Sequence, residues 1–362
     1  MALVTAALSV GGCIASYRTT ADLADRACPP AHAAPAMGWY APAAVRDRGA
    51  LDAWCAGVGP SVLDTLPATR ATTLGGVEAL RVLVWNVSAG GGDLLGFLES
   101  EAGLRCGPTR ASAPPFVLLA QEAYRRSGEV PPARSRTRVS APAAERERAG
   151  PRADVTTIAA RCGLALVYVP AVRNGGAEFP DGREDRGNAL LANVPLHDPI
   201  VIELPAEDSR RLVIAATIRG GTGDSLRVMS LHFTLLPKLW RNLTTGNAAR
   251  VRHALGMIDA LERLEADRSD GAVGQSATIA AGDANTWSDD DAALQRLRLA
   301  FPDSPAPLGE GTRGPFPADH VFFRRGNTGL RGGGLLEGTY RRLPSDYNSD
   351  HHPLVITYRF GR

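Results

Sequence analysis

The sequence of 362 residues contains a single lysine, Lys238, although arginine is abundant and the formal net charge is only +2. A nearly balanced charge does not by itself indicate a nucleic acid or a membrane as partner. The excess of arginine over lysine would suit the binding of phosphate oxygens, but a codon bias toward arginine is the simpler explanation. With 44% hydrophobic residues, the composition is typical of a globular protein with a large core in one or two domains.

Several common functional motifs are absent from the sequence. No group of cysteines and histidines has the spacing of a structural zinc site. No phosphate-cradling loop is followed by Lys and Ser or Thr, and no serine lies between glycines as in a nucleophile elbow. Beyond the N-terminal segment, no run is long and apolar enough to span a bilayer. These absences argue against a structural zinc site, P-loop nucleotide hydrolysis and a serine hydrolase of the elbow type.

Cysteine is also scarce, and the first of five cysteines stands apart from the others. Residues 2–10 are apolar and lead through small residues to Cys13, which resembles a bacterial lipoprotein signal without the usual preceding basic residues. The remaining cysteines form an even set, for which two disulfides in an oxidising compartment are expected: Cys28, Cys55, Cys106 and Cys162. We therefore expect an exported protein, periplasmic or on the outer surface, attached to a membrane by a lipid on Cys13. A cytosolic protein with five thiols is the alternative.

The chain divides into three parts by composition. Residues 1–27 comprise the signal and a mobile N-terminus, and residues 28–76 are rich in Ala, Pro and Gly, which predicts an extension packed on the main domain. Residues 77–362 form that domain. Within it, residues 125–152 are rich in Pro, Ser and Arg and have no hydrophobic period, which predicts a flexible surface insertion.

The main domain alternates apolar runs with turns. Strands are predicted from Leu80 to Trp85 and from Phe116 to Ala120, and seven further runs resemble them. The clearest helix covers residues 247–268, and its apolar face is predicted to contain these residues: Val251, Leu255, Ile258, Leu261 and Leu264. Because several neighbouring strands have no helix between them, the sequence favours mixed or antiparallel sheets over a purely parallel one.

Polar side chains end or follow many of these runs, where a sheet could bring them to one edge. They are Asn86, Glu122, Asn188, His232, Asp283, Asn285, Asp319, Asp350 and His351. Any one of them alone is usually a turn residue or a solvated side chain. As a set, the carboxylates and amides offer the oxygen ligands that Mg²⁺ takes, and the histidines and acids can activate water. The set therefore predicts metal-assisted attack of water on a phosphate ester.

The order of seven short motifs resembles that of the endonuclease/exonuclease/phosphatase superfamily, the deoxyribonuclease-I-like group, over about residues 77–362. The motifs are "WNV" at Trp85, "QE" at Gln121, "GNALLA" at Gly187, "SLHF" at Ser230, "GDAN" at Gly282, "ADHVF" at Ala318 and "SDHHPL" at Ser349. The resemblance implies an α/β fold, a four-layered sandwich of two mixed β-sheets flanked by helices. It also implies a site for Mg²⁺, which Mn²⁺ can replace, at one end of the sheets.

The resemblance further implies roles for the residues that would bind the metal and activate water. Asn86 and Glu122 match the metal-binding amide and acid of the superfamily, and Asp350 would lie next to the metal. Asp283 matches the residue that orients or deprotonates the attacking water. Asn285 matches the amide that holds a phosphate oxygen.

Two histidines are implied at the phosphate. His351 matches the histidine that contacts the scissile phosphate as acid, base or hydrogen-bond donor, and Asp319 matches the carboxylate that orients it. An imidazole needs such a partner to fix its tautomer, and a buried Asp is the usual one. His232 matches a second histidine near the phosphate. The register of the motif selects His351 rather than the adjacent His352.

One further acid or tyrosine near the phosphate has no clear counterpart in this sequence. Tyr168 is the candidate for this substrate-binding position. Its competitors are Glu178, Glu184 and Asp185. Asn188 is predicted to face the site, although a structural role in its turn is nearly as well supported.

The substrate class stays open, because nucleases, sphingomyelinase- or phospholipase-C-like lipases and inositol-phosphate phosphatases share this core. A nuclease is favoured, since the Arg-rich insertion could help to attract a polyanion, although a solvated loop is the default interpretation of that segment. The segment "FTLLPKLWRNL" from Phe233 could instead present Leu235, Leu236, Leu239 and Trp240 to lipid, although a helix start packed on the domain is the favoured interpretation. An inactive binding module is the alternative of another class. Inactive relatives usually lose metal-binding or histidine residues, which this sequence keeps, so an active hydrolase is expected.

Overall fold

The computed structural model describes residues 17–18, 37–42, 45–64, 77–106, 113–132, 152–174, 182–207, 209–221, 223–235, 247–269, 276–326 and 333–361. Several predictions fall outside these ranges. They include the lipid on Cys13, the central part of the Arg-rich insertion, the candidate acid Glu178, and Leu236, Leu239 and Trp240.

The described residues contain five helices. These are α1 (Val45–Cys55), α3 (Leu94–Glu101), α5 (Val155–Cys162), α7 (Asn247–Ser269) and α8 (Ala292–Ala300). No helix among these residues combines the length and hydrophobicity needed to cross a lipid bilayer.

The strands form two sheets, one of seven strands and one of eight. The seven-stranded sheet contains, in spatial order, β1 (Tyr17–Arg18), β2 (Gly38–Pro42), β8 (His197–Glu203), β9 (Leu212–Arg219), β10 (Ser225–His232), β11 (Ala277–Asp283) and β12 (Asp319–Arg324). The eight-stranded sheet contains β13 (Gly334–Leu335), β15 (Leu354–Arg359), β4 (Ala79–Asn86), β5 (Phe116–Arg126), β7 (Glu184–Ala192), β6 (Ala165–Arg173) and β3 (Val62–Asp64), with β14 (Arg341–Arg342) paired to β15.

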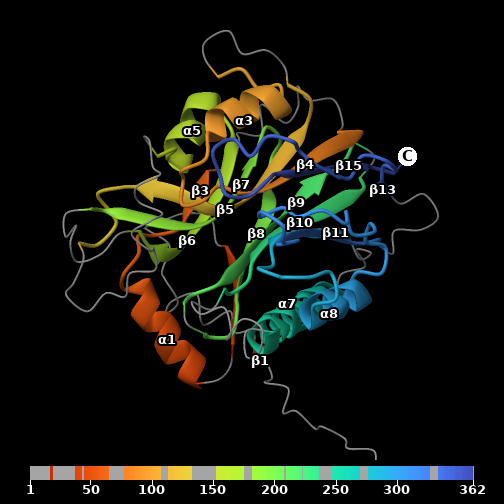
Figure 1. Ribbon diagram of the computed structural model, residues 1–362. Coiled ribbons are helices and arrows are strands. Elements are labelled where there is room, and N and C mark those ends of the chain that lie inside the picture. The colour runs from red at the N-terminus through yellow and green to blue at the C-terminus, as the bar shows by residue number, and fades with distance from the viewer. Residues whose placement is uncertain are drawn as a thin grey trace, which may run out of the picture.

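Both sheets are mixed, and helices cover their outer faces, so the predicted four-layered sandwich is confirmed. Strands β4 and β5 pair in parallel, as do β10 and β11, while most other pairs are antiparallel. Figure 1 shows α3 and α5 over the eight-stranded sheet and α7 and α8 under the seven-stranded sheet. The alternation of side chains along each strand produces these layers. In β4, Val82 and Val84 join the core between the sheets, whereas Leu83 and Trp85 face the helices.

Helix α7 covers the predicted residues, and four of the five predicted apolar residues pack against the core, namely Val251, Ile258, Leu261 and Leu264, whereas Leu255 does not. Leu255 is 42% exposed, while Ala254 and Met257 are buried against the seven-stranded sheet. Two polar residues share the buried face. Arg250 is bonded to Asp291, and His253 contacts the carbonyl of Pro205. The apolar pattern therefore located most of the buried side but missed its polar members.

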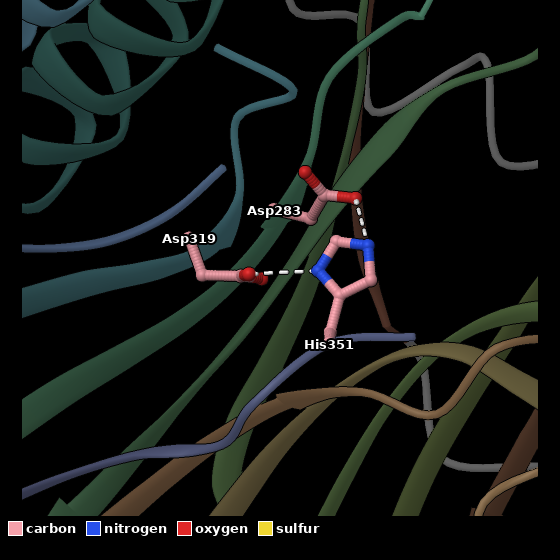
Figure 2. Close-up of side chains that lie close together, drawn as sticks. All are labelled: Asp283, Asp319 and His351. Carbon is pink, nitrogen blue, oxygen red and sulfur yellow. Dashed lines mark hydrogen bonds and ion pairs between the residues drawn. The ribbon is translucent and has the colours of Figure 1, made fainter. Parts of the chain in front are cut away.

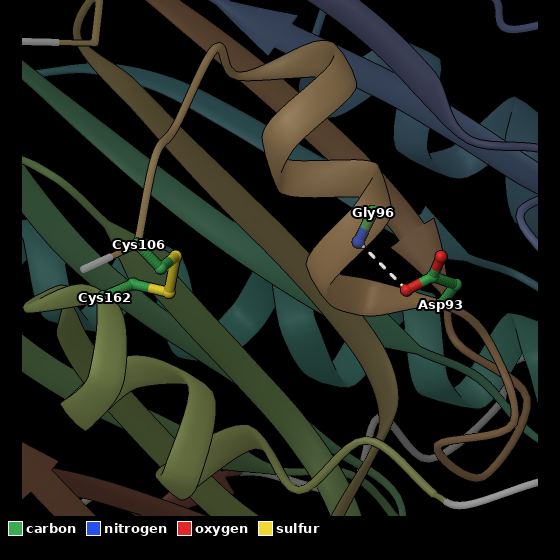
Figure 3. Close-up of a disulfide and its surroundings, with 4 residues drawn as sticks. All are labelled: Asp93, Gly96, Cys106 and Cys162. Carbon is green, nitrogen blue, oxygen red and sulfur yellow. Dashed lines mark hydrogen bonds between the residues drawn. A yellow bond between two sulfur atoms is a disulfide. The ribbon is translucent and has the colours of Figure 1, made fainter. Parts of the chain in front are cut away.

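A disulfide joins the ends of the two helices on the eight-stranded sheet. Cys106, in the segment after α3, is bonded to Cys162, the last residue of α5 (Figure 3). Asp93 caps the start of α3 by accepting a hydrogen bond from the backbone N–H of Gly96 at 2.9 Å. Cys55 is disulfide-bonded as well. The even set of four cysteines was expected to form such bonds.

The N-terminal extension contributes strands to both sheets. Strand β2 pairs in parallel with β8, and β3 pairs antiparallel with β6. The predicted boundary of the flexible insertion at residue 125 is wrong, because β5 continues through Arg126. Arg125 is buried, and its guanidinium bonds to Asp185, which fixes this part of the chain within the sheet.

Candidate active site

Three adjacent strands of the seven-stranded sheet bring polar residues to one edge. The last residue of β10, His232, is in register with Asp283, the last residue of β11. Asp283 is in turn in register with Asp319, the first residue of β12. All three side chains are buried. Strand pairing alone therefore brings together three residues that lie up to 87 positions apart in the sequence.

The facing eight-stranded sheet supplies the other half of the site. Asn86 ends β4, and His351 lies in the loop before β15, the strand that pairs with β4. The indole of Trp85 donates a hydrogen bond to the carbonyl of His351 at 3.1 Å. Glu122 lies at a bulge in β5, where the pairing with β7 shifts, and its φ is +53°. Such bulges are common beside active sites, because they redirect a side chain.

The imidazole of His351 lies between two buried carboxylates (Figure 2). Its Nδ1 is 2.7 Å from Oδ2 of Asp319, a hydrogen-bond distance. Its Nε2 is 3.8 Å from Oδ2 of Asp283, an ion-pair distance. The second oxygen of Asp319, Oδ1, is buried and has no hydrogen-bond partner among the described residues. The ring is therefore oriented by Asp319, while its other nitrogen points toward Asp283.

These contacts set the protonation of both partners. Burial by itself lowers the pKa of His351, but the carboxylates of Asp319 and Asp283 outweigh it and raise the pKa to about 9. Burial raises the pKa of Asp283 to about 6, although the charge of His351 opposes this shift. At neutral pH the histidine is therefore a cation and most of the aspartate is ionised.

Backbone and side-chain donors hold Asp283 in place. The amide of Asn86 donates to its Oδ2 at 2.9 Å, and the backbone N–H of Asn285 donates to its Oδ1 at 2.7 Å. Gly282 has a φ of +145°, and a Cβ there would lie 2.1 Å from the carbonyl oxygen of Leu231. Only glycine therefore allows β11 to lie this close to β10 at the residue before Asp283.

His232 is surrounded by positive charge. Nη1 of Arg211 lies 2.9 Å from each of its ring nitrogens. Burial, followed by Arg211 and Arg186, lowers the pKa of His232 well below its usual value. Since a guanidinium only donates, the imidazole accepts from it and is neutral. His232 is therefore suited to hydrogen bonding rather than to donating a proton as a cation.

Among the described histidine, cysteine and acidic side chains, one group of three has ligand atoms within 4.8 Å of one another: Asp283, Asp319 and His351. This group is a possible metal site. However, protonated His351 offers no lone pair to a metal, and Mg²⁺ prefers oxygen ligands. The group is therefore better suited to moving a proton.

The predicted metal ligands have the oxygen donors that Mg²⁺ takes, although each acid is also paired with an arginine. Glu122 Oε2 accepts from Arg186 at 2.7 Å, and Asp350 Oδ2 is 2.9 Å from Arg313 Nη2. Glu122 Oε1 lies 3.9 Å from His232 Nε2, too far for a hydrogen bond. The Oδ1 of Asn86 accepts from the backbone N–H of Ser88. In chemical type, these residues fit a hard cation.

The structure corrects the prediction for Tyr168. Its side chain is fully buried on the outer face of the eight-stranded sheet, and its hydroxyl donates to Asp185 at 2.8 Å. The competitor Asp185 is likewise buried there and bonded to Arg125. The site lies on the opposite face, because the neighbouring Arg186 reaches Glu122. Neither Tyr168 nor Asp185 therefore contacts the site.

Two predicted phosphate contacts are used inside the protein. The amide of Asn188 donates to the carbonyls of Leu212 and Ser230, both at 3.1 Å, and thereby ties the two sheets together. The amide of Asn285 donates to the carbonyl of Phe233 at 3.0 Å. An amide nitrogen carries two hydrogens. Asn285 therefore keeps one donor for a ligand, whereas Asn188 has used both.

Sequence reasoning missed the arginines of the site, Arg186, Arg211 and Arg313. Arg186 lies within β7 and Arg211 directly precedes β9, and the pairing of these strands brings them beside Glu122 and His232. Arg313 lies in a turn between α8 and β12. None of them belongs to a motif whose position indicates a site. The sole available signal was that each lies within a few residues of a strand end.

No family model matches the sequence, and no curated protein matches it. Solved structures do resemble the chain. An endonuclease/exonuclease/phosphatase from Beutenbergia cavernae is 14% identical, with a TM-score of 0.48 over 78% of this chain and 72% of that chain. An endonuclease/exonuclease/phosphatase family protein from Bacteroides thetaiotaomicron is 12% identical, with a TM-score of 0.42 over 78% and 95%.

A third similar structure is that of a beta toxin mutant from Staphylococcus aureus with bound magnesium ions. It is 10% identical, with a TM-score of 0.41 over 78% of this chain and 99% of that chain. These neighbours share little sequence with the chain. The chain's own structure is a four-layered α/β sandwich of two mixed sheets, with a buried Asp–His–Asp group at one end of the sheets.

Proposed function

We propose that the chain is a divalent-metal-dependent phosphoesterase that hydrolyses a phosphodiester, with nucleic acid as the favoured substrate. The observation that carries this proposal is the imidazole of His351 held between Asp319 and Asp283, where strand ends of both sheets meet. This group contains a buried proton donor, His351, and a buried proton acceptor, Asp283, and the pKa values of both are raised. Such pairs are typical of acid–base catalysis.

In the proposed reaction each member of this group has its own task. Asp283 accepts a proton from the attacking water. As the water oxygen bonds to phosphorus and the P–O bond to the leaving group breaks, His351, as a cation, donates a hydrogen bond to a phosphate oxygen or a proton to the leaving oxygen. Asp319 keeps the ring of His351 oriented and charged through the bond to Nδ1.

A divalent cation would be held by Glu122, with Asn86 and Asp350 beside it. When bound, it would neutralise negative charge that develops on the phosphate. Arg186 and Arg313 contact these acids. Guanidinium groups are well suited to phosphate oxygens, so the arginines support a phosphate ester as substrate.

Nucleic acid is favoured over lipid because three arginines lie at the site, Arg186, Arg211 and Arg313, and guanidinium groups can contact successive phosphates of a polyanion. The segment that suggested lipid contact lies mostly outside the described residues. An inactive binding module would not need the carboxylates and histidines that this site retains. Export is part of the proposal, since the Cys106–Cys162 disulfide is typical of an oxidising compartment.

The test uses the purified full chain with Mg²⁺, Mn²⁺ or EDTA. Plasmid DNA, a single-stranded oligonucleotide, RNA and sphingomyelin vesicles are assayed side by side. We expect cleavage of nucleic acid that EDTA abolishes, and a loss of about 10²–10⁴-fold in kcat for His351→Ala.

His352→Ala is the matched control, because this neighbouring ring contacts the carbonyl of Leu343 rather than the acids. Its kcat should stay near the wild-type value. Hydrolysis of sphingomyelin alone would change the substrate class. Absence of hydrolysis of every substrate by folded, metal-loaded protein would reject the enzyme hypothesis.

A further inference from the structure

A tight turn before β12 carries two side chains whose positions are linked by the backbone. Arg313 and Phe316 exchange both backbone hydrogen bonds, each at 3.1 Å, across the two-residue turn Gly314–Pro315. Residues opposite each other in an antiparallel pair place their side chains on the same face. The guanidinium of Arg313 and the ring of Phe316 therefore lie on one side of this turn.

Arg313 identifies that side as the one facing the active site. Its Nη2 is 2.9 Å from Oδ2 of Asp350, the residue before His351. The side chain of Arg313 is 35% exposed, and Phe316 is 37% exposed, one of the few large apolar side chains at the described surface. An apolar ring is thus presented to solvent beside a charged site.

A second aromatic side chain, that of Trp287, packs against the ring of Phe316. It follows Asn285 by two residues, and its ring contacts that of Phe316 edge to face, with centroids 4.5 Å apart and an interplanar angle of 71°. The hydroxyl of Thr286 donates to the carbonyl of Pro317 at 2.6 Å, which ties the two loops together. The aromatic pair is therefore held in place by loops that also carry catalytic residues.

We propose that Trp287 and Phe316 form a stacking site for an unpaired nucleobase next to the scissile phosphate, with Arg313 contacting the phosphate backbone. This inference rests on the proposed function and specifies its substrate as single-stranded or locally unpaired nucleic acid. Bases stack on aromatic rings largely without regard to sequence. A choline headgroup could also contact an aromatic ring, and the binding experiment below distinguishes it from a nucleobase.

The test combines changes in the protein with changes in the substrate. The full chain cleaves a short single-stranded oligonucleotide in which one base at a time is replaced by an abasic tetrahydrofuran residue. For the wild-type protein, kcat/KM should fall about tenfold or more at one position flanking the cleaved bond, the loss expected from one stacked base. Phe316→Leu and Trp287→Ala should each cause a similar loss on the intact oligonucleotide and little further loss on the abasic one.

Leu299→Ala is the matched control, because Leu299 is an apolar side chain on α8 that is 76% exposed. It should leave kcat/KM unchanged on both substrates. The variant proteins are also assayed on the abasic oligonucleotide. If the fold-loss in kcat/KM there equals the product of the two separate losses, the aromatic ring and the base act independently, which would reject the stacking site. Unchanged kcat/KM in folded Phe316→Leu and Trp287→Ala proteins would reject it as well.

Binding separates this inference from the proposed function. A fluorescent single-stranded oligonucleotide is titrated into the wild-type protein and the Phe316→Leu protein, with calcium in place of magnesium, and no turnover is needed. Weaker binding by Phe316→Leu supports the stacking site even if hydrolysis is never detected. Hydrolysis of sphingomyelin that depends on Phe316, without oligonucleotide binding, would assign the aromatic pair to a choline headgroup and overturn the inference.

Discussion

Two buried groups of charged residues lie on opposite faces of the eight-stranded sheet, and they differ in how fully they are bonded. On the outer face, both oxygens of Asp185 accept hydrogen bonds, from Arg125, from the hydroxyl of Tyr168 and from the backbone of Gly59. Arg125 also donates to the carbonyl of Pro60. This group is satisfied within the protein, and such a network contributes to the fold.

The group at the sheet ends leaves bonding capacity unused. Oδ1 of Asp319 is buried without a hydrogen-bond partner among the described residues, and Nε2 of His351 stays 3.8 Å from Asp283. An unmade bond in a buried site costs free energy, and such groups gather where a ligand or substrate completes them. Both groups are buried and charged. They differ in that the outer group is fully bonded within the protein, whereas Oδ1 of Asp319 and Nε2 of His351 remain able to bond a ligand.

The largest expected effect is a loss of kcat when the catalytic group of Asp283, Asp319 and His351 is disrupted. Asp283→Asn removes the proton acceptor but keeps the shape of the side chain, so kcat should fall about 10²–10⁴-fold. Because asparagine can accept only one of the two hydrogen bonds that Asp283 accepts, the melting temperature should fall by a few degrees while the protein stays folded. Initial rates on the preferred substrate and a thermal unfolding curve measure both. Retention of more than a tenth of wild-type kcat would remove Asp283 from the role of proton acceptor.

The second-largest expected effect is a loss of stability when the fully bonded group of Asp185, Arg125 and Tyr168 is disrupted. Asp185→Ala leaves the guanidinium of Arg125 buried without its partner, so the free energy of unfolding should fall by about 3–5 kcal/mol. The kcat of the folded fraction should not change. Urea unfolding measures the loss, and Asp259→Ala is the control, because its ion pair with Arg263 is a partly exposed i,i+4 pair on α7, of a kind worth about 0.3–0.5 kcal/mol. A loss equal to that control would show that the outer group is not structural.

The pH profile sharpens the comparison, since only the catalytic group should appear in it. Activity requires ionised Asp283, whose pKa is raised to about 6, and cationic His351, whose pKa is raised to about 9. The kcat/KM should therefore rise with pH through about 6, stay level, and fall above about 9, changing about tenfold per pH unit on each limb. An acid limb that persists unchanged in Asp283→Asn would belong to another group.

The smallest effect tests the residue that the sequence assigned to the substrate. Tyr168→Phe removes one hydrogen bond to Asp185, so the free energy of unfolding should fall by about 1 kcal/mol. The kcat and KM should be unchanged, because Tyr168 lies on the outer face of the sheet. A tenfold change in either constant would place Tyr168 in the reaction after all.

Sequence reasoning succeeded where one residue type carried a local signal. Polar residues such as Asp283 and Asn86 end apolar runs, and paired strands bring such ends together whatever the connecting loops contain. The order of the motifs then predicted the two mixed sheets and the helices outside them. The first feature depends on short-range patterns, which a single sequence displays, whereas the layered arrangement was implied by the resemblance of the motif order to a known superfamily.

The features that the sequence did not predict depend on which face of the sheet a side chain occupies and on the register between strands that are distant in sequence. Strand β6 is apolar on both faces, so its sequence does not reveal that Tyr168 faces the helices while Val167 faces the other sheet. Arg186 and Arg211 become site residues only through the pairing of β7 and β9 with their neighbours. No local pattern specifies these pairings.

The strands of the N-terminal extension have a practical consequence for where the folding unit begins. The sequence motifs start near Val77, yet a chain shortened to begin there would lose β2 and β3. Strands β8 and β6 would then become open edges, with unpaired backbone groups able to pair with other molecules. Such a chain would retain every catalytic side chain and still be prone to aggregate, so the limits of the motifs are not the limits of the folded domain.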